Sequence, residues 1–165
     1  CVRSMKKAVE YLCHRAKSFG IQVAMEDFDG KEAPFATKRQ LLSFLEDIPE
    51  LNCAFDTGNF LYSGEDALEA YWECKPYISY VHCKDRTFEP KAGETPKVAV
   101  DGRAMYSAPV GSGCIPMKEI VSDLLFSGYD GVFAIEHFGA LDQLEFIRRS
   151  AEWLTKLIKT VKNDN

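Results

Sequence analysis

The feature of this sequence that most constrains its fold is a regular alternation of short apolar segments with amphipathic ones. Four apolar segments are typical of buried strands, and each is followed, directly or after a loop, by a stretch with the apolar spacing of a helix. The predicted strands are 21–26, 51–56, 77–83 and 131–138. Continuous apolar strands that alternate with helices indicate an α/β fold, with a parallel sheet covered by helices.

The predicted helices have recognisable ends. Their apolar faces lie within residues 2–16, 41–48, 68–72, 120–125 and 141–161. Gly20 and Gly128 follow two of these helices as C-caps. Thr37 and Gln40 form a capping box before the second helix, and Ser63 is predicted to cap the third. The chain is therefore expected to start with a helix and to continue through four strand–helix repeats.

Length and charge narrow the class of protein. The chain of 165 residues is 46% hydrophobic and 27% charged, so we expect one globular domain over residues 1–165, or part of a larger one. The net charge of −5 and the lack of a basic run argue against nucleic acid or a membrane surface as partner. No apolar stretch approaches the roughly 20 residues that cross a bilayer, and no signal peptide opens the chain.

The cysteines favour a reducing compartment. There are six of them, scattered along the chain with no C-x-x-C pair. A disulfide scaffold is not expected in a chain with this much aliphatic core, so reduced thiols in a cytoplasm are the default interpretation. Cys53 and Cys83 lie inside predicted strands and are expected to be small core residues. Because the first residue is Cys1 and not Met, we expect a chain that is processed, cut or part of something longer.

Each of the four predicted strands delivers a metal-capable side chain at or near its carboxyl end. These residues are Glu26, Asp56, His82 and Glu136. In parallel α/β folds the carboxyl ends of the strands share one face, where ligands bind. We therefore expect the four side chains to converge within a few ångströms, although they are far apart in the chain.

Three carboxylates and one imidazole form a mixed oxygen and nitrogen site. Acids placed close together raise each other's pKa and repel, and a divalent cation removes that conflict. The absence of thiolates at these strand ends argues against a structural zinc site of the cysteine type, which leaves Mn²⁺, Mg²⁺, Co²⁺ or catalytic Zn²⁺. Taken singly, each residue could be a turn former, a buried histidine or an ion-pair partner. The four together favour a metal site.

Other polar residues lie close to these strand ends. Lys84, Asp85 and Arg86 follow the third strand and could bind substrate or pair with each other. His137 comes one position after the acid of the fourth strand. Because successive side chains of a strand point to opposite faces, we expect His137 to have a structural role.

The segment 86–116 is long, has no apolar periodicity, and is rich in Gly, Pro, Lys and Glu. A segment of this length in a compact domain favours a functional loop or lid over the active face. We expect Arg103 or Tyr106 to approach the substrate from it. Its motif PVGSGCIP contains G-x-G but lacks the dinucleotide fingerprint, so it is a weak phosphate signal.

The series VAMEDF, FDTGNF, YVHCKD, PVGSGCIP and GYDGVFAIEHFG closely resembles the C-terminal half of the sugar phosphate isomerase/epimerase superfamily. The strongest parts of the resemblance are the H-x-K-D tetrapeptide and the I-E that ends the last strand. The superfamily has the xylose-isomerase-like (β/α)8 TIM barrel. The resemblance therefore implies a half-barrel that covers roughly the last four β/α units and is truncated at the N-terminus. Open edges and an open apolar face are unfavourable, so we expect a missing barrel half or a homo-oligomer partner to close it.

The resemblance also implies a site and a reaction. Glu26, Asp56, His82 and Glu136 would hold one divalent metal ion (Mn, Mg, Co or Zn). Ketose 3-epimerases of the superfamily use the two metal-bound glutamates as acid and base. Carried over, Glu26 and Glu136 would act on opposite faces of a carbon next to a carbonyl, through an enediolate stabilised by the metal. The expected activity is isomerisation or epimerisation of a small carbohydrate, a sugar or sugar phosphate, in the cytoplasm.

Some positions depart from the superfamily pattern. The epimerases have a histidine where this chain has Asn59, which can hydrogen-bond a sugar hydroxyl but does not titrate near neutrality. Their substrate-contacting arginine lies further beyond the histidine than Arg86 does here. Asn59, Lys84 and Arg86 are the candidate substrate-binding residues. A metal-dependent dehydratase or hydrolase, or a non-catalytic fragment or assembly module of the same fold, stays an alternative.

Overall fold

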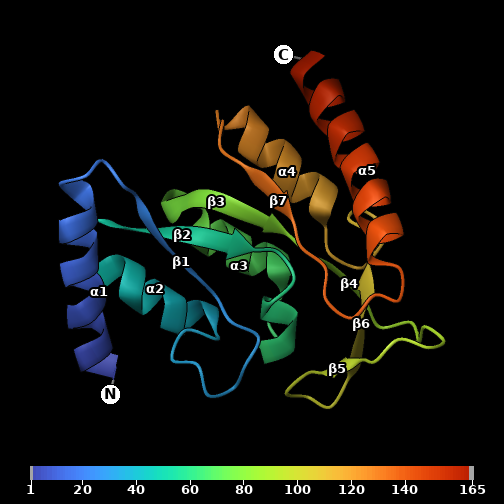
Figure 1. Cartoon of the computed structure of the whole chain (residues 1–165), viewed down its shortest axis with the longest axis horizontal. Coiled ribbons are helices and arrows are strands. Elements are labelled where there is room, and N and C mark those ends of the chain that lie inside the picture. The colour runs from blue at the N-terminus through green and yellow to red at the C-terminus, as the bar shows by residue number, and fades with distance from the viewer. Residues whose placement is uncertain (1, 164–165) are drawn as a thin grey trace.

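The computed structural model describes residues 2–163 (Figure 1). Its helices are α1 (Val2–Lys17), α2 (Lys38–Asp47), α3 (Ala67–Cys74), α4 (Met117–Phe126) and α5 (Gln143–Asn163), with 3-10 turns η1 (Phe60–Ser63) and η2 (Lys75–Tyr77). Its strands are β1 (Val23–Glu26), β2 (Leu51–Asp56), β3 (Ile78–Cys83), β4 (Asp85–Thr87), β5 (Lys97–Val98), β6 (Ala104–Ala108) and β7 (Phe133–Ile135). The predicted alternation of strands and helices is confirmed. None of the described helices has the length and apolar character that a membrane crossing needs.

The main sheet is parallel, with the strand order β1-β2-β3-β7. Its carboxyl ends therefore lie along one edge. In the register, Asp56 is opposite His82, and His82 is opposite Ala134, two residues before Glu136. β1 ends at Glu26, which is opposite Ala54. The register thus brings all four residues that were predicted to converge to the same end of the sheet.

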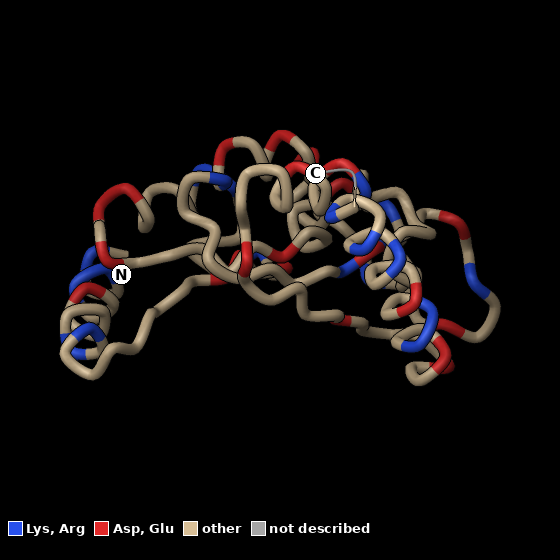
Figure 2. The backbone as a smooth tube through the Cα atoms, turned by 90° about the horizontal axis from the view of Figure 1, so that it is seen from above, with Lys and Arg blue, Asp and Glu red and all other residues tan. Residues whose placement is uncertain are grey.

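The hydrophobic core lies between the sheet and the helices on one side of it. Figure 2 shows the backbone as an arch in the view from above. Phe55 on β2 stacks on Phe60 with a ring-centroid distance of 5.6 Å and meets Tyr71 edge-on at 5.8 Å. All three rings are fully buried. These contacts anchor the segment after β2, which carries the polar residues of the site.

The helix caps follow the sequence with one correction. Thr37 caps α2 in a complete capping box with Gln40, as predicted. The prediction that Ser63 caps α3 is wrong, because the cap is Asp66, whose Oδ1 accepts hydrogen bonds from the N–H groups of Leu68 and Glu69, both at 2.9 Å. Ser63 lies earlier, in η1, and its hydroxyl donates to the carbonyl of Ala36 at 2.6 Å.

The two edges of the main sheet, formed by β1 and β7, are unpaired within residues 2–163. β1 and β7 each pair along one side within residues 2–163. Large apolar side chains are exposed around both ends: Tyr11, Leu12, Phe19 and Ile21 near β1, and Val132, Phe138, Leu141 and Leu144 near β7. Leu12 was predicted to lie on the buried face of the first helix but is 54% exposed, because Cys13 and Ala16 take the buried positions. Within residues 2–163 the four-stranded parallel sheet therefore has two unpaired edges.

The segment 86–116 differs from the predicted structureless loop. Together with Asp85 it forms a small antiparallel sheet with the order β4-β6-β5. The strands are too short to leave a readable alternation in the sequence. Lys97 Nζ pairs with Asp29 Oδ1 at 2.6 Å beyond β1, and the N–H of Val100 donates to the carbonyl of Tyr62 at 2.9 Å in η1. The small sheet therefore contacts the segments that follow β1 and β2, beyond the carboxyl ends of the main sheet.

Candidate metal centre

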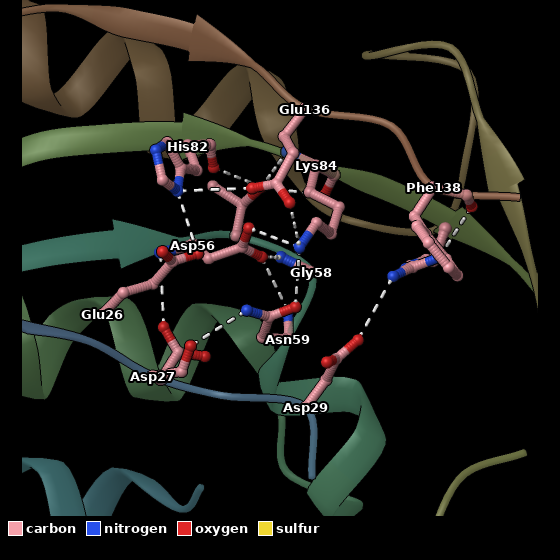
Figure 3. Close-up of polar contacts among 12 residues, drawn as sticks. Glu26, Asp27, Asp29, Asp56, Gly58, Asn59, His82, Lys84, Glu136 and Phe138 are labelled. Carbon is pink, nitrogen blue, oxygen red and sulfur yellow. Dashed lines mark hydrogen bonds and ion pairs between the residues drawn. The ribbon is translucent and has the colours of Figure 1, made fainter. Parts of the chain in front are cut away.

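Glu26, Asp56, His82 and Glu136 lie together at the carboxyl end of the main sheet (Figure 3). One ligand atom from each of the four residues lies within 4.8 Å of the others. The Asp56 side chain is fully buried, whereas those of Glu26 and Glu136 are 36% and 41% exposed. The cluster therefore has a buried floor and an accessible side that two carboxylates line.

His82 stands between the two glutamates. Its Nδ1 lies 2.9 Å from Glu26 Oε1 and 3.3 Å from Glu136 Oε2. The hydrogen bond to Glu26 raises the pKa of His82 above its ordinary value, although burial opposes this. Protonated, the imidazole compensates the carboxylates. Neutral, it offers a ring nitrogen to a metal, so metal binding here would release a proton.

Asp56 has one oxygen fully used and one left over. Its Oδ1 accepts hydrogen bonds from the backbone N–H groups of Gly58 and Asn59, both at 2.8 Å. Its Oδ2 accepts no hydrogen bond of good geometry from residues 2–163, although Lys84 Nζ lies 2.9 Å away as an ion pair. Burial raises the pKa of Asp56 to about 6, and the charge of Lys84 opposes that rise. The carboxylate is thus held rigidly with one oxygen available to a cation.

Lys84 is a buried ammonium inside the acidic cluster. It is 5% exposed, and its Nζ lies 2.9 Å from Asp56 Oδ2 and 3.1 Å from Glu136 Oε1. The same Nζ donates to Asn59 Oδ1 at 2.9 Å. Burial alone would lower the pKa of Lys84, but the charges of Asp56 and Glu136 outweigh it and raise that pKa. Lys84, predicted as a substrate ligand, therefore lies in direct contact with two of the four clustered residues.

Asn59, also predicted as a substrate ligand, is 3% exposed, and both ends of its amide bind the protein. Its Nδ2 donates to the carbonyl of Asp27 at 3.0 Å. Sequence reasoning missed Asp27, which is fully buried and whose Oδ1 accepts the N–H of Asp56 at 3.3 Å. Burial, followed by the charge of Asp56, raises the pKa of Asp27 well above its ordinary value. The one feature of the sequence that points to Asp27 is its position directly after Glu26.

Arg86 lies beside the cluster and not within it. Its side chain is 3% exposed, with one terminal nitrogen 3.6 Å from Asp29 Oδ2 and the other 3.5 Å from the carbonyl of Phe138 (Figure 3). Arg86 therefore spans the segments that follow β1 and β7. Asp85 faces away from the cluster and accepts hydrogen bonds from backbone N–H groups of the 111–115 loop.

Two further predictions concern residues outside the cluster. His137 packs toward α5, with its Nε2 2.9 Å from the hydroxyl of Ser150, and burial lowers the pKa of His137. Arg103 is exposed and pairs with Asp101 two residues earlier at 2.6 Å. Tyr106 lies on β6 opposite Thr87. The structure thus brings Arg86, and not Arg103, to the edge of the cluster.

The donor set fits a divalent cation. Three carboxylates and one imidazole converge, and Asp56 Oδ2, which accepts no backbone N–H and pairs with the Lys84 ammonium, points into the group. Oxygen and imidazole ligands suit Mg²⁺, Mn²⁺, Co²⁺ and Zn²⁺. The thiols nearest in sequence, Cys53 and Cys83, are buried in the hydrophobic core and belong to a different environment.

Fold and cluster together define a partial parallel α/β barrel with an acidic centre at its carboxyl end. A family model described as a xylose isomerase-like TIM barrel matches residues 1–157. The chain belongs to this xylose isomerase-like TIM barrel family. The family and the half-barrel architecture inferred from the sequence motifs are therefore confirmed.

The chain is also similar to proteins of known name. An inosose dehydratase of Lacticaseibacillus casei is 29% identical over 133 residues, which cover 78% of this chain and 44% of that protein. A xylose isomerase-like TIM barrel protein from Mycobacterium smegmatis in complex with magnesium is 21% identical, with a TM-score of 0.75 over 94% of this chain and 50% of that one. The IOLI protein with a bound zinc atom is 18% identical, with a TM-score of 0.69 over 96% and 56%. The chain spans about half the length of the proteins it matches.

Proposed function

We propose that this protein is, or forms part of, a metal-dependent enzyme that removes a proton from the carbon next to a carbonyl of a small sugar or cyclic polyol ketone. The observation that carries the proposal is the convergence of Glu26, Asp56, His82 and Glu136 within 4.8 Å. Such a carbon is weakly acidic, so the charge that develops on the carbonyl oxygen needs fixed cationic partners. A divalent metal held by these four residues would act as a Lewis acid on the substrate oxygens.

The two glutamates differ in their surroundings, and this difference assigns their roles. Glu26 is partly exposed and its ionic partner is His82. Glu136 is also partly exposed but is held by both His82 and the Lys84 ammonium. Glu26 thus has one cationic neighbour and Glu136 has two, so the oxygens of Glu26 are the less engaged of the two carboxylates. We therefore expect Glu26 to remove the proton and Glu136, with Lys84, to act on the other side of the substrate.

Two outcomes can follow proton removal. If Glu136 returns a proton to the same carbon or its neighbour, the product is an epimer or an isomer, as the superfamily resemblance suggests. The second candidate is dehydration, for which Lys84, 3.1 Å from Glu136, would be the second proton donor. There the electrons of the broken C–H bond form a C=C bond, the C–O bond on the next carbon breaks, and Lys84 protonates the departing hydroxyl to give water. The 29% identity to an inosose dehydratase also supports this candidate.

The test is hydrogen exchange in D2O. The purified protein is incubated with Mn²⁺ and a panel of ketoses and cyclic polyol ketones, and products are followed by NMR and mass spectrometry. We expect deuterium at the carbon next to the carbonyl of one of them. An epimer or isomer keeps the mass of the substrate apart from the deuterium, whereas dehydration removes one water. No exchange with any member of the panel would contradict the proposal.

The control is a pair of matched variants. Glu26→Gln should slow the exchange by about 10²–10⁴-fold, the usual contribution of a positioned general base. Glu32→Gln changes an exposed glutamate in the connection that follows β1 and should leave the rate unchanged. Equal rates for the two variants would exclude Glu26 as the base.

We further infer that additional polypeptide closes the sheet, either the other half of the barrel or a second copy of this chain. The open ends at β1 and β7 and the exposed apolar side chains around them support this. Burying apolar surface contributes roughly 25 cal/mol per Å², so a few hundred Å² left open forgoes several kcal/mol. Sedimentation of the 165-residue chain tests it. A compact, well-folded monomer at high dilution would contradict it.

A further inference from the structure

The turn formed by residues 56–59 is built around Lys84. Thr57 Oγ1 accepts the backbone N–H of Lys84 at 2.9 Å and donates to the carbonyl of Lys84 at 2.8 Å. A Cβ on Gly58 would lie 2.7 Å from that carbonyl oxygen and 3.0 Å from Lys84 Cγ, so only glycine leaves room for this approach. The turn therefore clamps the backbone of Lys84 and leaves its side chain directed into the cluster (Figure 3).

The amide of Asn59 completes the turn and has a defined orientation. Its Nδ2 donates to the carbonyl of Asp27 at 3.0 Å, which requires its oxygen to point the other way, toward Lys84 Nζ at 2.9 Å. Its backbone N–H donates to Asp56 Oδ1. With 3% exposure, the Asn59 side chain is closed off from a substrate. Its contacts are all internal, and its oxygen serves Lys84.

The other partners of the Lys84 ammonium belong to the acidic cluster. Asp56 Oδ2 and Glu136 Oε1 lie 2.9 and 3.1 Å from it, and both residues are proposed ligands of the metal. A divalent cation on these carboxylates offsets their charge and weakens their attraction for the ammonium. Asn59 Oδ1 is neutral and lies outside the ligand set, so its hydrogen bond to Lys84 persists.

We infer that Asn59 is a positioning residue, which keeps Lys84 in place at the substrate when a metal occupies the carboxylates. The inference rests on the proposed function for the role of Lys84 in the reaction, but the contact itself can be tested without turnover. The inference also gives a role to Asn59 at the position where the ketose 3-epimerases have a histidine. In this chain the residue would act on Lys84 and not on a sugar hydroxyl.

The experiment measures how fast an amine reagent modifies Lys84, read by peptide mass spectrometry, with and without Mg²⁺. In the metal-loaded protein, Asn59→Ala should speed the modification by about 10- to 100-fold, the range expected for losing one hydrogen bond to a charged group. Without metal, the two carboxylates still hold Lys84 and the increase should be smaller. Asn59→Asp keeps an oxygen acceptor and should restore the protection.

The matched control is Asn52→Ala. Asn52 lies on β2, the strand that leads into the turn of Asn59, and its Nδ2 donates to a β1 carbonyl, that of Val23, at 3.3 Å, but it makes no hydrogen bond with Lys84. Equal modification rates of Lys84 in the Asn52 and Asn59 alanine variants would overturn the inference. So would an increase that does not depend on Mg²⁺, because that is the result of a merely structural role.

A separate titration with Mg²⁺ distinguishes failure of the inference from failure of the proposed function. If the wild-type protein binds no metal, the proposed function fails, and the metal-free rates alone decide the contact. If Asn59→Ala does not fold, the wild-type protein is labelled with ¹⁵N-lysine. A slowly exchanging Lys84 Nζ signal in the metal-loaded protein then supports the inference, and rapid exchange overturns it.

Discussion

Two buried aspartates near the carboxyl ends of neighbouring strands, Asp56 and Asp85, have opposite uses. Both are almost fully buried, at 0% and 1% exposure. Asp85 Oδ1 accepts the N–H groups of Arg86 and Ile115 at 2.9 and 3.2 Å, and its Oδ2 accepts those of Gly111 and Gly113, both at 2.9 Å. Asp56 spends only Oδ1 on the backbone and keeps Oδ2 for the cluster.

Asp56 and Asp85 are equally buried, so the burial of an acid does not by itself indicate a binding site. A carboxylate with both oxygens used by backbone N–H groups stabilises a loop, here the 109–116 turn that carries the G-x-G motif. A carboxylate oxygen that accepts no backbone N–H and lies among other acids can bind a cation, here the Lys84 ammonium or a metal ion. Four predictions test this distinction, from the largest expected effect to the smallest.

Asp85→Ala should destabilise the protein by about 4 kcal/mol, because it leaves four backbone N–H groups without their acceptor, two of them in buried hydrogen bonds and two in partly buried ones. The measurement is the free energy of unfolding in urea. Affinity for Mn²⁺ should change little in the fraction that stays folded. The control is Asp101→Ala, an exposed aspartate that also accepts a backbone N–H, that of Arg103 at 3.0 Å, and it should cost no more than about 0.5 kcal/mol. Equal destabilisation by Asp85→Ala and Asp101→Ala would contradict the structural role given to Asp85.

Asp56→Asn should weaken Mn²⁺ binding by about 100-fold or more, since even the outer partners of metal ligands typically contribute about 10–100-fold. The amide keeps an oxygen for the N–H groups of Gly58 and Asn59, so the metal-free protein should stay folded. Calorimetric titration with Mn²⁺ measures the effect. Unchanged affinity would show that Asp56 Oδ2 is not a ligand.

The free energy of unfolding should also depend on pH because of Asp56. Burial raises the pKa of Asp56 from 3.8 to about 6 in the folded protein. The folded state therefore binds the proton more tightly, and the stabilising effect of protonation is lost as pH rises from about 4 to about 6. The loss is at most about 3 kcal/mol. Unfolding of the metal-free protein across this range should show it, and Asp56→Asn should flatten the curve. A wild-type curve that rises over this range would contradict the account.

The smallest effects concern the glycines beside the two acids. A Cβ on Gly113 would overlap Asp85, and one on Gly58 would press on the backbone of Lys84. Each alanine substitution should cost about 1–2 kcal/mol through local overpacking. Only Gly58→Ala should also weaken Mn²⁺ binding, because only that turn holds Asp56. A similar loss of Mn²⁺ affinity in both variants would contradict the separate roles given to Asp56 and Asp85.

Much of the cluster was predictable because each part has a local signal. Glu26, Asp56, His82 and Glu136 each end an apolar run, and parallel topology forces such ends together whatever the loops between them do. The contact between Asn59 and Lys84 had no such signal. It depends on the turn after one strand meeting the end of the next, which is a tertiary contact.

Other misses have similar causes. The strands of the small sheet are two to five residues long, and their pairing depends on Asp85 gathering distant N–H groups. The true cap of α3, Asp66, competes with Ser63 at the level of sequence, and the choice follows from Ser63 donating instead to Ala36 across the fold. Local patterns thus identify the elements, while their caps and short pairings follow from packing.

The central claim is that four strand ends form one metal site. The most direct measurement is anomalous diffraction from crystals of the Mn²⁺-loaded protein. The account predicts a single strong peak among Glu26, Asp56, His82 and Glu136, with Asp56 Oδ2 among its ligands. No peak at that position, or a strong peak elsewhere in its place, would contradict the claim.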